Sequence, residues 1–229
     1  MRARDRKERE SYVAGRLDDP PNNILIVGDA LRADALHSLG NPRPVTPFID
    51  ASGGGRLVWR DVGHSVCAES LCGLMGIAKS RYPHELTRES VSLHDVLAAH
   101  GYRNSLIFGG DHTNFYGLAG MFGRIDEFRD GAGAQGYMND DRLVIRYTQE
   151  TPAFDGRPTF LHYHLMSTHG LGLKLDDFKR FAPALNHYNA IAMGQASDQS
   201  KPQLLRNFYD NGAAPFDWVV SELLGVVRE

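Results

Sequence analysis

The sequence predicts an α/β fold with a largely parallel sheet. Short apolar runs typical of buried strands alternate along the chain with segments of helical pattern. Several of the runs end in glycine and are followed by polar residues, as the strands of parallel sheets often do. The length of 229 residues suits one good-sized domain. We place this domain at residues 22–229, after a charged leader at 1–21 that is expected to be a frayed helix or a linker.

Four segments have the composition of strands. Residues 23–28 form a continuous apolar run that is rich in β-branched residues and ends at Gly28, which is typical of a central parallel strand. The other three predicted strands have similar apolar runs and are residues 57–62, 103–108 and 158–166.

Three segments are predicted to be helices. Residues 29–36 are expected to begin a helix directly at the end of the first strand. Residues 92–100 have Ser92 as an N-cap and Gly101 as a C-cap. Residues 208–227 have the pattern of an amphipathic helix. Alternation of these helices with the strands predicts the parallel sheet.

The composition is that of an ordinary soluble globular protein, with 42% hydrophobic residues, 23% charged residues and a net charge of −3. This excludes a disordered or fibrous chain and argues against a polybasic nucleic-acid binder. The amino terminus lacks the apolar core of a signal peptide, and no window reaches the ~18 apolar residues of a membrane span. These absences favour a soluble, cytoplasmic chain. Cys67 and Cys72 are too few for a disulfide framework, and a bridge between them is expected to be sterically unfavourable because they lie five residues apart.

Reactive side chains follow several predicted strands. Asp29, Asp111 and His169 come just after strands, and Cys67 lies a few residues beyond one. Because ligands of open α/β sheets bind at the carboxyl ends of the strands, we expect a site at this edge. Asp29 is interpreted as a ligand for a divalent metal or as an N-cap. Cys67 is interpreted as a nucleophile at a helix N-terminus or as a buried thiol.

Other polar residues have two interpretations each. His162 and His164 lie on one face of a strand, where they either bind one metal or are half-buried with satisfied nitrogens. Ser70 is a second candidate hydroxyl, expected to satisfy a local backbone group. Asp111-His112 is interpreted as a metal site or a polar turn. The pairs Asp140-Asp141 and Asp176-Asp177 are interpreted as solvated surface, and Cys72 as a buried thiol.

Five segments resemble one known family. Residues 23–34, with their glycine, carboxylate and Arg-Ala-Asp, resemble the opening of the sulfatase branch of the alkaline phosphatase superfamily, and especially the phosphoethanolamine and phosphoglycerol transferases. Similar segments follow in the family's order over residues 22–227: the Gly-x-x-Arg-x-x-Thr-Pro pattern at 39–50, the nucleophile segment at 67–70, the His-x-x-Gly-Ser-His-Gly pattern at 164–170 and the Tyr-Asp-Asn helix at 209–217. The resemblance implies an alkaline-phosphatase-like α/β/α sandwich.

This resemblance implies a metal-dependent hydrolase or transferase that acts on sulfate or phosphate esters through a covalent intermediate. The implied roles are Asp29 as metal ligand, Cys67 as nucleophile, His169 as a contact to the substrate or leaving group, and His164 and Ser70 as substrate-binding residues. The implied cofactor is a divalent ion such as Zn, Ca or Mn. The implied partner is a small-molecule, lipid or glycan ester rather than a nucleic acid. Relatives of this family mostly act in the periplasm or outside the cell, often behind membrane spans that this chain lacks.

The chain departs from the family pattern at two places. The transferases use threonine as nucleophile, whereas sulfatases use a modified cysteine within Cys-x-Pro-x-Arg or Cys-x-Ala-x-Arg, and Cys67 is followed by Ala-Glu-Ser-Leu. In the family, a strand ending in Asp-His-Gly follows the Tyr-Asp-Asn helix, whereas this sequence ends at Glu229, and Asp111-His112 comes too early to be that motif. We therefore expect the carboxyl-terminal part of the domain to be missing, the metal to be held weakly and turnover to be slow or absent.

Two alternatives remain open. One is a non-catalytic sulfatase-fold fragment that serves as a binding module. The other is a metal-dependent amidohydrolase suggested by His162-Tyr-His164, although its barrel needs more strand-helix units than this length provides.

Overall fold

A four-stranded parallel sheet forms the centre of the protein. A computed structural model describes residues 1–15, 17–52, 63–115, 117–136, 139–186, 188 and 202–228. Its strands are β1 (Asn23–Gly28), β2 (Arg103–Phe108), β3 (Glu127–Arg129) and β4 (Thr159–Leu165), in the order β1-β4-β2-β3 with every neighbouring pair parallel. The predicted α/β class with a parallel sheet is thus confirmed.

Two details of the sheet differ from the prediction. β1 pairs with β4 alone in the described part of the chain, so it lies at an edge rather than at the centre. Its first two residues are correspondingly exposed. β3 was not predicted, because three half-buried residues with two charged side chains do not form an apolar run. The predicted strand at 57–62 lies outside the described residues.

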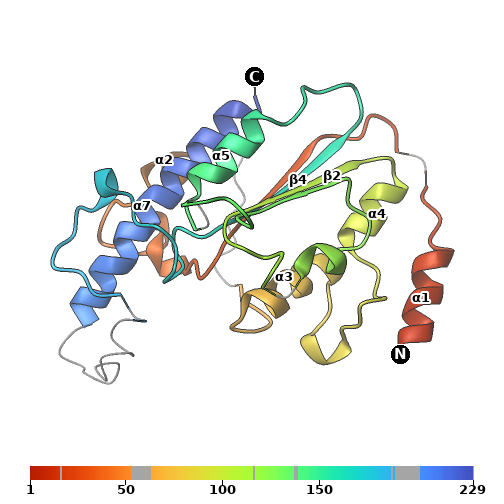
Figure 1. The fold of residues 1–229 in the computed structure, drawn as a ribbon, viewed down its shortest axis with the longest axis horizontal. Coiled ribbons are helices and arrows are strands. Elements are labelled where there is room, and N and C mark those ends of the chain that lie inside the picture. Colours follow the sequence, from red (N-terminus) through yellow and green to blue (C-terminus); the bar gives the residue numbers. More distant parts are fainter. Residues whose placement is uncertain are drawn as a thin grey trace.

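Helices cover both faces of the sheet (Figure 1). On one face, α5 (Arg142–Gln149) and α7 (Pro202–Val226) pack against Ile107, Tyr163 and Leu165. On the other face, α3 (Ser70–Lys79) packs against Leu106 and Phe108, and α4 (Leu93–Ala99) lies beside β2. Neighbouring residues of one strand face opposite layers because strand side chains alternate. The remaining described helices are α1 (Arg2–Ser11), α2 (Pro47–Ser52) and the short 3₁₀ turns Ala33–Ala35, His37–Leu39, Pro83–Glu85, Leu118–Met121 and Asp176–Phe178.

The helix predictions succeed where the capping residues are clear. Ser92 accepts a hydrogen bond from the backbone N–H of Asp95, whose carboxylate accepts one from the Ser92 N–H in return, so α4 begins with a capping box. The C-cap is His100, and Gly101 follows it in the left-handed conformation at φ 88°. The helix predicted at 29–36 is wrong: residues 29–30 form a turn, and two 3₁₀ turns follow. α5 was not predicted, and α7 begins six residues before the predicted helix.

The leader is attached to the domain through a buried carboxylate. Residues 2–11 form α1, and Asp5 within it is 1% exposed. Its carboxylate accepts hydrogen bonds from Arg81, Thr87 and Ser90, of which the Thr87 bond is the shortest at 2.6 Å. These bonds hold the pKa of Asp5 below its usual value, with the Thr87 hydroxyl as the largest cause. None of the described helices is both long enough and apolar enough to span a membrane.

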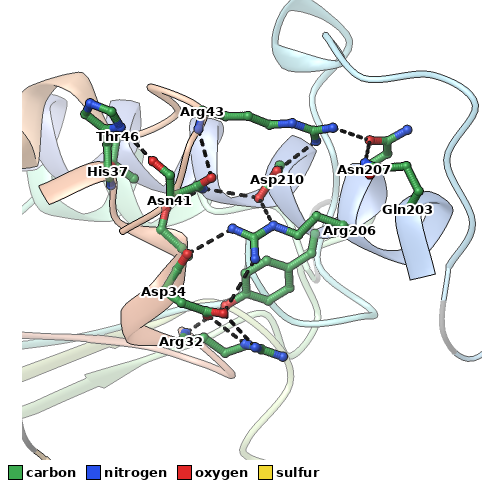
Figure 2. A network of polar contacts seen from close by, with 12 residues as sticks. Arg32, Asp34, His37, Asn41, Arg43, Thr46, Gln203, Arg206, Asn207 and Asp210 are labelled. Carbon is green, nitrogen blue, oxygen red and sulfur yellow. Dashed lines mark hydrogen bonds and ion pairs between the residues drawn. The ribbon is translucent and has the colours of Figure 1, made fainter. Parts of the chain in front are cut away.

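A network of charged residues joins α7 to the segment after β1 (Figure 2). Asp210 on α7 has a fully buried side chain. Its two carboxylate oxygens lie 2.8 Å from Nη1 of Arg43 and 2.9 Å from Nε of Arg206. Arg206 also donates to the backbone carbonyl of Asp34 at 2.9 Å. The network therefore fixes residues 34–43 on the surface of α7.

The neighbouring polar residues of α7 bind backbone groups in other segments. Asp217 accepts hydrogen bonds from the N–H groups of Phe48 and Ile49, which lie in the first turn of α2. Asn211 bonds to both the N–H and the carbonyl of Phe181. The residues that suggested a family motif thus act as structural ties between distant segments.

Replacement of Asp210 by alanine is expected to lower the free energy of unfolding by about 3 kcal/mol, because two arginines lose a buried partner. Asp34 also pairs with Arg206 but is 47% exposed, so Asp34→Ala is expected to cost under about 1 kcal/mol. Urea denaturation of both variants measures the difference. Equal losses would show that the buried network is not what holds α7.

Candidate functional site

Asp29 lies at the carboxyl edge of the sheet, between β1 and the loop that follows β4. Its backbone N–H donates to the carbonyl of Leu165 at 2.8 Å. Its carbonyl accepts a hydrogen bond from the Thr168 hydroxyl at 2.6 Å. The Asp29 backbone is therefore held on one side by the last residue of β4 and on the other side by the loop that follows.

The turn after Asp29 has a strained backbone. Ala30 has φ 58°, a left-handed conformation that alanine rarely adopts. The Tyr209 hydroxyl donates to the Ala30 carbonyl at 2.8 Å and accepts from the Arg32 N–H at 2.7 Å. Tyr209 on α7 thus stabilises the turn, which explains why residues 29–36 do not form the predicted helix.

Ser70 lies against Asp29. Its hydroxyl donates to Oδ2 of Asp29 at 2.9 Å, although the two residues are 41 positions apart. The expectation that this hydroxyl satisfies a local backbone group is therefore wrong. Ser70 is the first residue of α3, and no side chain caps that end of the helix. The first N–H groups of a helix lack partners within it and favour anions, so this end of α3 is suited to phosphate or sulfate oxygens.

Cys67 and Cys72 form a disulfide bond, with their Cα atoms 6.1 Å apart. The expectation that such a bridge is sterically unfavourable is wrong. The chain turns at Glu69, from the extended segment into α3, and this turn brings Cys72 in the first helical turn back towards Cys67. A disulfide sulfur carries no thiolate, so the oxidised protein lacks the nucleophile that was predicted at Cys67.

His164 lies on the other side of Asp29. Its Nε2 atom is 3.6 Å from Oδ2 of Asp29, and its Nδ1 atom is 3.1 Å from Nε2 of His112. Burial lowers the pKa of His164 to about 3 and also lowers the pKa of His112. Both imidazoles are therefore neutral near pH 7. Asp29, Ser70, His164 and His112 form a continuous row of polar contacts.

His162 belongs to a different cluster. It is fully buried, and its Nδ1 atom lies 3.3 Å from Nε2 of His94 on α4. The Phe108 ring packs against both His162 and His164, with centroid distances of 5.1 and 5.3 Å. The two histidines share a face of β4, as predicted, but contact different partners. Within the described ranges, no three His, Cys, Asp or Glu side chains are grouped so that they could hold a metal.

His169 lies in the loop after β4, close to these residues in the chain. Its Nδ1 accepts a hydrogen bond from the Leu171 N–H at 3.2 Å, and its Nε2 is 3.3 Å from the Tyr188 hydroxyl. A cavity of about 780 Å³ begins at the next residue, Gly170. Glycines 131, 133 and 136 form part of its wall, with Leu171, Leu173 and Phe208.

The acidic candidates separate into exposed and buried groups. Asp111 binds the N–H and side-chain amide of Asn114 in a turn, and Asp176 is exposed as predicted. Asp140 and Asp141 were predicted to be solvated, but both are only 3% exposed. Asp140 pairs with Arg142, whereas Asp141 accepts hydrogen bonds from the loop that carries His169. Burial raises the pKa of Asp141 to about 6.

Two residues of this region gave no clear signal in the sequence. Lys174 is buried beneath the same loop, although a lysine two residues before an acidic pair is typical of the surface. His112 follows a glycine pair and was expected in a metal site or a polar turn; the structure turns its ring inward against His164. A Cβ at Gly109 would collide with the Asp141 carboxylate, so a glycine is required at this position. Gly109 was therefore the one feature of the sequence that indicated close packing around Asp141.

Solved structures with a similar fold are domains of phosphoethanolamine transferases. The soluble domain of lipooligosaccharide phosphoethanolamine transferase A from Neisseria meningitidis matches 95% of this chain and 65% of its own length, with a TM-score of 0.70 and 17% identity. The C-terminal periplasmic domain of EptC from Campylobacter jejuni matches 92% and 64%, with a TM-score of 0.67 and 16% identity. That of EcEptC from Escherichia coli, solved in complex with zinc, matches 92% and 60%, with a TM-score of 0.62 and 19% identity.

The chain thus spans less than two thirds of the length of these domains. No curated protein sequence matches it. The sequence model of the Sulfatase family matches residues 21–229, which is nearly the whole chain. The resemblance inferred from the five motifs is confirmed: the chain belongs to the Sulfatase family, within the alkaline phosphatase superfamily.

Proposed function

We propose that the protein is a transferase or hydrolase of phosphate or sulfate esters that works through a covalent intermediate on Ser70. The observation that carries this proposal is the 2.9 Å contact between the Ser70 hydroxyl and the Asp29 carboxylate at the N-terminus of α3. A hydroxyl needs a neighbouring group that takes its proton before it can act as a nucleophile. Asp29 is such a group for Ser70. Ser70 takes the nucleophilic role in place of Cys67, because Cys67 is bonded to Cys72.

The reaction proceeds by two displacements. In the first, the Ser70 oxygen attacks phosphorus or sulfur, its proton passes to Asp29, and the bond to the ester oxygen breaks, so that this oxygen takes a proton from solvent and leaves as the substrate alcohol. In the second, water or an acceptor alcohol attacks the Ser70 ester and loses its proton to solvent, and the released Ser70 oxygen regains its proton from Asp29. The N–H groups at the start of α3 stabilise the charge on the transferred group. We assign His169, on the half-buried loop, to the leaving group.

The residues around Asp29 fit a divalent metal in part. An Asp oxygen and a Ser oxygen 2.9 Å apart are close enough to share one ion, and a neutral His164 has the protonation state that ligation requires. A bound ion would polarise the ester oxygens and favour the deprotonated hydroxyl. Zinc is the first ion to test, because the related EcEptC domain was solved with zinc. Three donors are fewer than the four that closed zinc sites use, so we expect weak binding.

The cavity beside His169 is the proposed place for the rest of the ester. Most of its lining is glycine and apolar side chains, although Lys174, Lys179 and Asp140 also line it, and this composition suits the uncharged portion of a lipid or glycan ester. We place the protein in an oxidising compartment. The Cys67–Cys72 bridge supports this location, because disulfides persist outside the reducing cytoplasm, and so do the periplasmic domains of similar fold.

Ser70→Ala is expected to abolish turnover of p-nitrophenyl phosphate or sulfate in the presence of added zinc or manganese, because it removes the attacking oxygen. Ser65→Ala is the matched control: Ser65 lies in the same segment but bonds to the Cys67 carbonyl, so its loss should change the rate less than about threefold. Cys67→Ala is expected to retain measurable activity. Loss of activity in Cys67→Ala, with Ser70→Ala still active, would contradict the assignment of Ser70 and identify Cys67 as the nucleophile.

Zinc titration by calorimetry is expected to give a dissociation constant above about 1 µM, because the described residues supply an incomplete ligand set. Asp29→Asn is expected to weaken that binding at least about tenfold, whereas Asp111→Asn, which alters a carboxylate in a turn, should leave it unchanged. Submicromolar affinity would contradict the partial site. Equal effects of the two variants would contradict the role of Asp29.

The non-catalytic alternative rests on the same short ligand set. A binding module of this fold would retain affinity for a phosphate or sulfate ester while every variant and the parent protein show no turnover above buffer. Equilibrium binding of a non-hydrolysable phosphonate, measured beside the turnover assay, separates the two functions.

A further inference from the structure

The buried side chain of Lys174 holds the loop between β4 and Lys174 through hydrogen bonds. The Nζ atom of Lys174 donates hydrogen bonds to three backbone carbonyls of this loop: those of Ser167 at 2.8 Å, His169 at 2.7 Å and Gly172 at 2.9 Å. An ammonium group has three N–H bonds, so all of its donors are used within one turn of chain. The residue is only 6% exposed.

The other side of the loop is held by a buried carboxylate. Asp141, which directly precedes α5, accepts hydrogen bonds from the N–H groups of Met166 at 2.8 Å and Ser167 at 2.7 Å. It also accepts a short hydrogen bond from the Ser167 hydroxyl. Ser167 is thus bound through its N–H and hydroxyl to Asp141 and through its carbonyl to Lys174.

The loop in turn carries the parts of the site. Leu165 and Thr168 bond to the two sides of the Asp29 backbone, and His169 is bound to Lys174 through its carbonyl. A displacement of the loop would therefore move the Asp29 carboxylate and the His169 ring together. An error of about 1 Å in such groups can slow a reaction by about a hundredfold.

Asp141 and Lys174 are both charged groups that are buried beside the loop after β4. A charged group removed from water is destabilising unless it is fully hydrogen-bonded, and both of these groups are. Burial shifts both towards neutrality, lowering the pKa of Lys174 to about 8 and raising that of Asp141 to about 6. α7 also adapts to the lysine: a Cβ at Gly212 would collide with the Ser167 carbonyl and with the Lys174 side chain.

We propose that Asp141 and Lys174 are positioning residues, which hold the β4 loop so that His169 and Asp29 are aligned with Ser70. This inference rests on the proposed function of Ser70 and extends it to two residues that hold the loop, of which Lys174 also lines the cavity beside His169. Asp141 fixes the position of the first residues of the loop, and Lys174 fixes the conformation of the turn that follows. Neither residue is assigned a chemical step.

The chain contains a matched control for each residue. Lys79 is also 6% exposed and its Nζ donates to two backbone carbonyls, those of Thr87 and Arg88, but these belong to a loop beyond α3. Asp217 is nearly as buried as Asp141 and its carboxylate also accepts hydrogen bonds from two backbone N–H groups, but these belong to α2. Variants at Lys79 and Asp217 therefore report the general cost of losing a buried charge without disturbing the β4 loop.

The test compares Lys174→Met with Lys79→Met, and Asp141→Asn with Asp217→Asn, in the full chain. For the ester that the parent protein turns over, we expect kcat to fall at least about tenfold in Lys174→Met and Asp141→Asn, with KM changed less than about threefold. In the two controls kcat should stay within about threefold of the parent value, even where the melting temperature falls by a similar amount. Equal kcat losses in a variant and its control would overturn the positioning role.

A readout independent of turnover separates this inference from the proposed function. In protein with labelled histidines, the His169 ring resonances are expected to shift in Lys174→Met and Asp141→Asn but not in the controls. Should Lys174→Met fail to fold, Gly212→Ala serves in its place, since it keeps every polar group and presses on the lysine. Unchanged His169 resonances in the folded variants would overturn the inference, whereas shifted resonances in a protein without turnover would leave the positioning role standing and refute the function.

Discussion

The site depends on the position of the loop that follows β4. Thr168 of this loop and Leu165 at the end of β4 bond to the two sides of the Asp29 backbone, and the loop also carries His169. Asp141 and Lys174 hold it from opposite sides, and Gly212 lets α7 approach it closely. Hydrogen bonds to these two charged groups hold the loop in place. α5 and α7 thereby become part of the site without supplying a group to the chemistry.

Ser70 is positioned from the opposite layer by covalent and helical constraints. The Cys67–Cys72 bridge encloses it in a short ring of chain, and it begins α3, which packs on β2. Asp29 and Ser70 therefore meet although one belongs to a sheet edge and the other to a helix on one face. A bridge that closes so short a loop contributes modestly to global stability in the chain-entropy account. Its more specific consequence here is local, because it limits the conformations open to Ser70.

The sequence was sufficient for the parts of the structure that follow local rules. Ser92 marked the start of α4, the apolar runs marked β1, β2 and β4, and the order of five motifs identified the family. Prediction from the sequence failed where contacts between distant segments determine the local structure. The 29–36 segment has a helical pattern, but Tyr209 from a helix about 180 residues away stabilises a left-handed Ala30 instead. Asp141 and Lys174 look like surface residues because their partners are backbone groups of a loop that only the fold brings near, and the disulfide was missed because the turn at Glu69 could not be foreseen.

In the proposed reaction an oxygen nucleophile at Ser70, rather than a sulfur at Cys67, receives the transferred group. Acid quenching of the protein during turnover, followed by peptide mapping under non-reducing conditions, tests this most directly. The account predicts a phosphoryl- or sulfuryl-type adduct on Ser70 in a peptide that still contains the Cys67–Cys72 bridge. An adduct on Cys67, or continued turnover with Ser70 unmodified and replaceable, would contradict it.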